Sequence, residues 1–107
     1  MQRVTLVRYR AKPDRAAENE ALSRAVFDEL RAKAPENMAY ALFRDGLEFV
    51  HLFVNLEADD SSGLTELPSF KAYSQDTAGR FEAPPEVTRL SLNLIEAYGL
   101  AGVMAPA

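Results

Sequence analysis

Residues 38–56, MAYALFRDGLEFVHLFVNL, contain the clearest structural pattern in the sequence. Two apolar runs, rich in β-branched and aromatic residues, flank the dipeptide Asp45-Gly46. An Asp-Gly pair between two such runs is typical of a tight β-hairpin. We therefore expect two antiparallel strands joined by a short turn. The only histidine of the chain, His51, lies in the second strand.

The second strand of the hairpin has apolar side chains on both faces, because successive residues of a strand point to opposite sides. One face has only aliphatic side chains, those of Val50, Leu52, Val54 and Leu56. The other face also has aromatic and polar side chains, and its members are Leu47, Phe49, His51, Phe53 and Asn55. A strand with two apolar faces is expected to be covered on both sides.

The segment before the hairpin predicts a strand followed by a helix. Residues 3–10 alternate well enough for a strand. Residues 14–34 are rich in Ala, Glu, Arg and Leu, which favour helices, and Asp14 is placed to cap the first turn. Apolar side chains recur along this helix at three- and four-residue spacing, at Leu22, Val26, Phe27, Leu30 and Ala34.

The segment after the hairpin predicts an acidic loop, a second helix and a last strand. The loop covers residues 57–63, and the helix covers residues 68–82 with Pro68 in its first turn. The apolar stripe of this helix consists of Leu67, Phe70, Tyr73, Thr77 and Phe81. Residues 87–98 predict a strand whose core face is formed by Leu90, Leu92 and Leu94.

The composition is that of an ordinary globular protein, with 48% apolar and 26% charged residues in a chain of 107. The absence of cysteine excludes disulfides, a thiolate nucleophile and a cysteine-based metal site. A net charge of -4 argues against binding to nucleic acid or to an anionic membrane. The acidic loop lacks the ligand spacing of a calcium site. No signal peptide or membrane span is evident, so we expect a cytoplasmic protein.

The order strand, helix, strand, strand, helix, strand predicts an α+β protein with a ferredoxin-like β-α-β-β-α-β fold. In this fold two helices cover one face of a four-stranded antiparallel sheet. Right-handed crossovers place the first and third strands at the centre of the sheet. We expect a single domain over residues 1–98 and a C-terminal tail at residues 99–107.

A sheet with helices on one face leaves its other face uncovered. We expect the aliphatic face of the third strand, with Val50 and Leu52, to pack against the helices. The face with Phe49 and Phe53 is then bare in a monomer, and soluble monomers rarely expose large apolar patches. We therefore expect a homodimer that forms through the sheet face opposite the helices.

Several stretches resemble the dimeric α+β barrel superfamily, and within it the antibiotic-biosynthesis-monooxygenase-like branch. They are VRYRAKPDRAAENEAL at residues 7–22, the helix ended by Pro35, the paired central strands, LPSFKAY at residues 67–73 and the last strand. The resemblance covers residues 3–98. It implies a cofactor-independent monooxygenase, without metal, haem or flavin, that deprotonates a quinol-like substrate so that its anion reacts directly with oxygen. The chain has no tryptophan, which argues against the haem-degrading branch.

If the face opposite the helices lines a cavity between two copies, one histidine and several polar and aromatic side chains meet there. His51 is the candidate catalytic base, because an unperturbed histidine has a pKa of about 6.5. The candidate substrate-binding residues are Phe49, Phe53, Asn55, Arg89, Ser91 and Asn93. An apolar pocket with a few convergent polar groups is the usual form of a small-molecule site.

Each of these assignments has a structural alternative. His51 also fits a hydrogen-bonded histidine of the core or interface, and Arg89 equally fits a partner of the acidic loop. Asn55 and Asn93 fit backbone or inter-subunit hydrogen bonds, and the two phenylalanines fit a dimer core. For the whole protein, the alternative to an enzyme is a non-catalytic small-molecule-binding or structural homodimer of the same fold.

Overall fold

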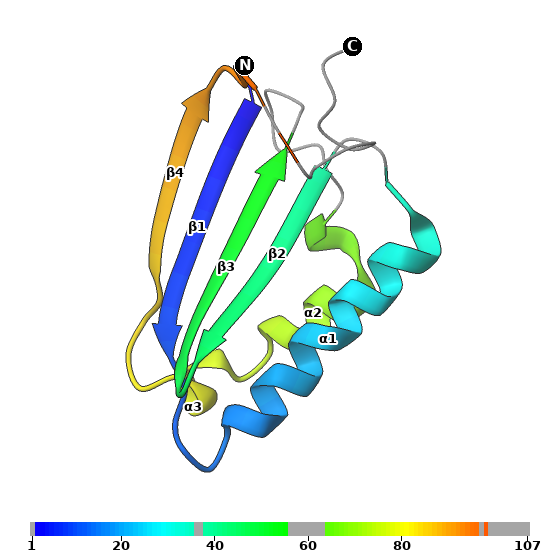
Figure 1. Ribbon diagram of the computed structural model, residues 1–107. Coiled ribbons are helices and arrows are strands. Elements are labelled where there is room, and N and C mark those ends of the chain that lie inside the picture. Colours follow the sequence, from blue (N-terminus) through cyan, green and yellow to red (C-terminus); the bar gives the residue numbers. More distant parts are fainter. Residues whose placement is uncertain (1, 36–37, 56–63, 97, 99–107) are drawn as a thin grey trace.

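The computed structural model describes residues 2–35, 38–55, 64–96 and 98 of the chain. The described residues form one sheet with helices on one of its faces (Figure 1). The elements in chain order are β1 (Gln2–Arg10), α1 (Ala16–Lys33), β2 (Met38–Asp45), β3 (Glu48–Asn55), a 3-10 helix (Leu64–Glu66), α2 (Pro68–Ser74), α3 (Thr77–Arg80) and β4 (Glu86–Leu92).

The sheet has the predicted topology. Its strand order is β2-β3-β1-β4 and all neighbours are antiparallel, so the first and third strands are central. The hairpin between β2 and β3 turns at Gly46, whose φ of 60° is a conformation that glycine adopts without steric cost. The predicted α+β ferredoxin-like architecture is therefore confirmed.

The second helical region differs from its prediction, because it is broken into α2 and α3. Asp76, between them, has a left-handed backbone with φ of 56°, which Asp tolerates better than most residues. Arg80 donates hydrogen bonds to the carbonyl oxygens of Tyr73 and Gln75, at 2.5 and 2.6 Å. These carbonyls lie at the end of α2, where helical partners are missing, so the arginine caps the break.

Two element boundaries also differ from the prediction. Helix α1 begins at Ala16, and the N-cap position belongs to Arg15, so the expected cap by Asp14 is wrong. Strand β4 ends at Leu92 rather than at residue 98. Leu56, the acidic loop at residues 57–63 and the tail at residues 99–107 lie outside the described residues. None of the helices in the described part of the chain is long and apolar enough to cross a membrane.

The helices cover the sheet face that we expected to be bare. Phe49 and His51 are 0% and 4% exposed and lie in the core with the inward side chains of α1 and α2. The prediction that Val50 and Leu52 pack against the helices is therefore wrong, since these residues lie on the other face. Leu90, which we expected in the core, is also on that face and is 45% exposed.

The buried polar residues of the helices help to explain why the helices pack on the sheet face with Tyr9 and His51. Asn19, Ser23 and Arg80 are buried on the inner side of the helical layer and need hydrogen-bond partners. Tyr9 on the sheet accepts a hydrogen bond from Asn19, whereas Ser23 and Arg80 bond to groups of the helical layer itself. Burying an unsatisfied polar group costs about 1–3 kcal/mol, so the partner that Tyr9 provides for Asn19 favours this face.

Candidate functional site

A cavity of about 580 Å³ lies between the helix-covered face of the sheet and the segments that follow β3. The sheet contributes Val7, His51 and Phe53 to its lining. The opposite side is largely aromatic and is formed by Leu64, Phe70, Tyr73 and Phe81. The volume is in the usual range for small-molecule sites, which are mostly apolar with a few polar groups.

His51 lies in this lining with both ring nitrogens hydrogen-bonded. The hydroxyl group of Tyr40 is 2.7 Å from Nδ1, and that of Tyr9 is 2.8 Å from Nε2. The hydroxyl group of Tyr73 is 3.3 Å from Nε2. Burial lowers the pKa of His51 to about 4, because the charged form loses its hydration. The ring is therefore neutral at pH 7.

The hydrogen bonds around Tyr9 determine which nitrogen of His51 carries the proton. The Tyr9 oxygen accepts a hydrogen bond from Asn19 Nδ2 and another from the Tyr73 hydroxyl, both at 2.8 Å. A hydroxyl oxygen has two lone pairs, so its own proton is donated to Nε2 of His51. The neutral ring then has its proton on Nδ1 and donates it to the Tyr40 oxygen. The hydroxyl proton of Tyr40 is left for a ligand.

A buried arginine holds this network in one orientation. Arg80 is 1% exposed, and its Nε donates to Oδ1 of Asn19 at 3.1 Å. The amide of Asn19 must therefore present its nitrogen to Tyr9, because its oxygen is already engaged. Burial raises the pKa of Tyr73 and of Tyr9, so both phenols remain protonated at neutral pH.

Three of the seven predicted site residues line the cavity, namely His51, Phe53 and Arg89. Phe53 and Arg89 both pair with Thr5 of β1, so they lie in one row across the sheet. The predicted location of the cavity, between two copies of the chain, is wrong. The cavity lies inside one protomer because the helices cover the His51 face of the sheet.

The other four predicted site residues do not line the cavity. Phe49 is fully buried and stacks on Tyr9, with ring centroids 5.5 Å apart. Asn55 is 1% exposed at the end of β3. Ser91 and Asn93 are exposed, one near the end of β4 and the other beyond it. A role in substrate binding remains a prediction for these four.

Sequence reasoning missed the helical half of the network. Tyr73 was assigned only to the apolar stripe of a helix, and Asn19 and Arg80 were not singled out. Asn19 is three residues before Leu22 on α1, so it falls on the apolar face of that helix. A polar residue within an apolar stripe is the pattern that indicates a buried hydrogen-bond network.

The charged side chains described in the lining of the cavity are all positive. Its described members include two arginines, Arg3 and Arg89, and no carboxylate. Among the described residues no group of three histidine, aspartate or glutamate side chains is arranged to hold a metal ion. The lining therefore combines apolar side chains with a neutral imidazole, the phenols of Tyr40 and Tyr73, three threonines and two arginines.

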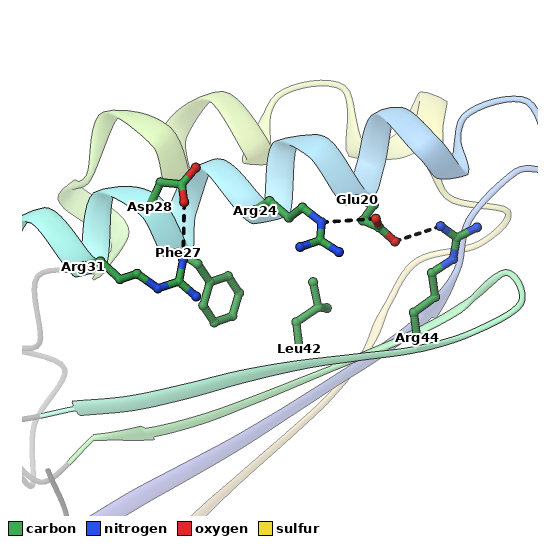
Figure 2. Close-up of a pocket in the computed structure, with 7 residues that line it drawn as sticks. All are labelled: Glu20, Arg24, Phe27, Asp28, Arg31, Leu42 and Arg44. Atoms are coloured by element: carbon green, nitrogen blue, oxygen red, sulfur yellow. Dashed lines mark hydrogen bonds and ion pairs between the residues drawn. The ribbon is translucent and has the colours of Figure 1, made fainter. Parts of the chain in front are cut away.

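A second hollow, of about 460 Å³, lies between α1 and β2 (Figure 2). Its charged side chains are already paired with one another. Glu20 accepts from Arg24 at 3.2 Å and from Arg44 at 2.9 Å, and Arg31 donates to Asp28 at 3.3 Å. A ligand would have to replace these pairs, so the cavity beside His51 is the candidate site.

No protein-family model matches the chain, and no curated protein matches its sequence. Solved structures nevertheless share its architecture. The protein Rv0793 from Mycobacterium tuberculosis superimposes with a TM-score of 0.75 and 22% identity, over 92% of this chain and 100% of that one. Two further structures, from Caulobacter crescentus and Nitrosomonas europaea, are each described as a "putative antibiotic biosynthesis monooxygenase".

The Caulobacter protein superimposes with a TM-score of 0.73 and 16% identity, over 87% of this chain and 91% of that one. The Nitrosomonas protein superimposes with a TM-score of 0.70 and 17% identity, over 83% and 88%. The chain has the fold of the antibiotic-biosynthesis-monooxygenase-like proteins. The resemblance noted in the sequence is thus confirmed for the fold.

Proposed function

We propose that the protein is a cofactor-independent monooxygenase that acts on a small, quinol-like aromatic substrate in the cavity beside His51. The observation that supports this best is the direction of the hydrogen bonds. Tyr73 lines the cavity and donates to Tyr9, which in turn donates to His51 Nε2. A proton that leaves a substrate hydroxyl therefore has a continuous path to a basic nitrogen.

In the first step, the substrate hydroxyl donates to the Tyr73 oxygen, and three protons shift along the path in turn. Tyr73 and Tyr9 each receive one proton and release another, so both remain neutral phenols. His51 becomes an imidazolium, and the substrate becomes an anion. Tyr40 then donates its free hydroxyl proton in a hydrogen bond to the anionic oxygen, which is the stabilisation that such a step requires.

The cost of this step shows why the positive margin of the cavity matters. Moving a proton from a phenol with a pKa of about 10 to an imidazole with a pKa of about 4 costs about 8 kcal/mol. An ion pair ~6 Å apart at an effective dielectric constant of ~20 contributes about 3 kcal/mol. Attraction of the anion to the imidazolium therefore offsets about a third of the cost, and the more distant Arg89 adds a smaller contribution in the same direction.

The electron-rich anion then reacts with molecular oxygen. It gives one electron to oxygen, and the two radicals combine to form a peroxide on a ring carbon, which takes the proton back from His51. Loss of water from this hydroperoxide leaves one oxygen atom on the ring. For hydroquinone the balanced outcome is one hydroxyquinone and one water per oxygen molecule, with all four electrons supplied by the substrate.

A non-catalytic ligand-binding protein is the second candidate function. The observation in its favour is that both ring nitrogens of His51 already have phenolic partners, as in a histidine that only stabilises the core. In that case the cavity binds an aromatic molecule without turnover. Oxygen consumption separates the two functions.

The proposal includes a homodimer that forms through the sheet face opposite the helices. On this face β1 contributes Leu6, β3 contributes Leu52, and the edge strands contribute Phe43 and Leu90. Phe43 is 57% exposed, and such a continuous apolar sheet face is unusual for a soluble monomer. A second copy related by a two-fold axis would cover it without leaving an unpaired surface.

The test is oxygen uptake with a panel of hydroquinones under air. The wild-type protein should consume one oxygen molecule per product, and His51→Gln and Tyr73→Phe should each lower kcat by about 10²–10⁴-fold. Tyr98→Phe, at a fully exposed position, serves as the matched control and should leave kcat unchanged. Equal rates for the wild type and the His51 variant would remove His51 from the mechanism. No uptake by the wild type with any hydroquinone would favour the binding protein.

A further inference from the structure

We propose that the ligand of the cavity is a hydroxylated aromatic acid, whose hydroxyl end meets Tyr40 and Tyr73 and whose carboxylate meets Arg89. The inference rests on the proposed assignment of this cavity as the ligand site, but it does not require turnover. Three features of the lining lead to it: its charge, the free hydroxyl proton of Tyr40 and the placement of Tyr40 and Arg89 in one row of the sheet.

The charge of the lining is opposite to that of the chain. The whole sequence has a net charge of -4, yet the described residues around the cavity include Arg3 and Arg89 and no carboxylate. Within the described part of the chain, Arg89 has no ion-pair partner. The arginines of the hollow between α1 and β2, by contrast, are paired with carboxylates (Figure 2).

An arginine at the margin of an apolar cavity favours a carboxylate over other polar groups. Its planar guanidinium presents two parallel N–H donors that match the two oxygens of a carboxylate. A neutral quinol has no group that would use this donor pair. The positive margin therefore points to a ligand with an acidic substituent.

The other end of the ligand is defined by Tyr40. The Tyr40 oxygen accepts the proton of His51 Nδ1, so its own hydroxyl proton is available to a ligand oxygen. Tyr73 offers an acceptor position on the same side of the cavity. A ligand hydroxyl can thus accept from Tyr40 and donate to Tyr73, and a bare hydrocarbon edge would leave both groups unmatched.

The two ends lie on one face of the sheet, on its two edge strands. Tyr40, Phe53, Thr5 and Arg89 occupy one row across β2, β3, β1 and β4. Three strand spacings of about 4.8 Å place the backbones of Tyr40 and Arg89 ~14 Å apart. Both side chains line the same cavity, and Phe53, in the row between them, also lines it and offers an aromatic contact to the ligand.

The test measures binding by calorimetry under nitrogen, so that no substrate is consumed. The probes are 2,5-dihydroxybenzoate, hydroquinone, which lacks the carboxylate, and benzoate, which lacks the hydroxyls. We expect 2,5-dihydroxybenzoate to bind about tenfold to a hundredfold more tightly than hydroquinone, because a hydrogen-bonded charge pair is worth that much. Arg89→Gln should abolish this preference.

Two further variants complete the test. Arg24→Gln removes one positive charge from the other hollow and should keep the preference for the acid. Tyr40→Phe should weaken 2,5-dihydroxybenzoate more than benzoate. Equal affinity for 2,5-dihydroxybenzoate and hydroquinone, or a preference lost in Arg24→Gln but kept in Arg89→Gln, would overturn the inference. Tight binding of the acid without oxygen uptake in air would support the inference and contradict the monooxygenase.

Discussion

The hydroxyl group of Tyr9 donates its one proton to Nε2 of His51, 2.8 Å away. Asn19 and Tyr73 occupy both acceptor positions of the same oxygen, so the direction of this hydrogen bond is fixed. As a consequence, the histidine is held in one tautomer and one orientation. Helix α1, helix α2 and strands β1 and β3 all contribute to that single arrangement.

The Tyr9 hydroxyl makes hydrogen bonds with three partners, whereas the Tyr73 hydroxyl donates one hydrogen bond, to Tyr9. Tyr9→Phe leaves the Asn19 amide without its buried partner and leaves the Tyr73 hydroxyl and His51 Nε2 only each other, 3.3 Å apart, so it should lower the free energy of unfolding by about 2–3 kcal/mol. Tyr73→Phe should cost about 1 kcal/mol. Urea unfolding of the two variants beside the wild type measures both values. Equal losses would show that the network is not centred on Tyr9.

The low pKa of His51 predicts a pH dependence of stability. Between about pH 6.5 and pH 4 the unfolded chain protonates this histidine and the native protein does not, so the free energy of unfolding falls as the pH falls. A pKa of about 4 against 6.5 corresponds to about 3 kcal/mol, all present above pH 6.5. Urea unfolding at a series of pH values measures the slope.

The control for this slope is His51→Gln, which replaces the ring by an amide that does not titrate. Its stability should be nearly constant between pH 5 and 6.5. Carboxylates such as Glu29, whose pKa is lowered by its hydrogen bond from Ser69, change the stability mainly below about pH 4.5, the ordinary pKa of the unfolded group. An unchanged slope in the variant would assign the pH dependence to another group.

The uncovered sheet face predicts the oligomeric state. The wild type should sediment at micromolar concentration with about twice the chain mass of 11.9 kDa. Leu52→Asp, at the middle of that face beside Leu6, should give a monomer because it would bury an unpaired charge. Ala25→Asp, at an exposed position of α1, is the matched control and should remain dimeric. A monomeric wild type would contradict the proposed interface.

The elements of the fold could be predicted because their patterns are local. Asp45-Gly46 specifies the hairpin turn through the conformation that glycine allows, and Pro68 marks the first turn of α2. Apolar spacing located α1, and the order of the elements then determined the sheet. The break at Asp76 was missed because it depends on Arg80, whose side chain caps the carbonyl groups released there.

The orientation of the sheet could not be predicted from alternation. Both faces of β3 are apolar, so a two-residue period does not show which face meets the helices. The choice depends on hydrogen bonds between residues far apart in the sequence, such as Tyr9 with Tyr73 and Asn19 with Arg80. His51 was nevertheless found as a site candidate, because it is a lone titratable residue within an apolar strand.

The central claim is that His51 is a neutral, Nδ1-protonated imidazole at the end of a hydrogen-bonded path from the cavity. Because the chain has one histidine, the ¹⁵N resonances of its ring can be assigned without ambiguity. The measurement is a ¹⁵N–¹H correlation of protein labelled at histidine, across pH and with hydroquinone under nitrogen. We predict a proton on Nδ1, no titration above about pH 5 and shifted resonances when hydroquinone binds. A ring that titrates near pH 6.5 with its neutral proton on Nε2 would contradict the account.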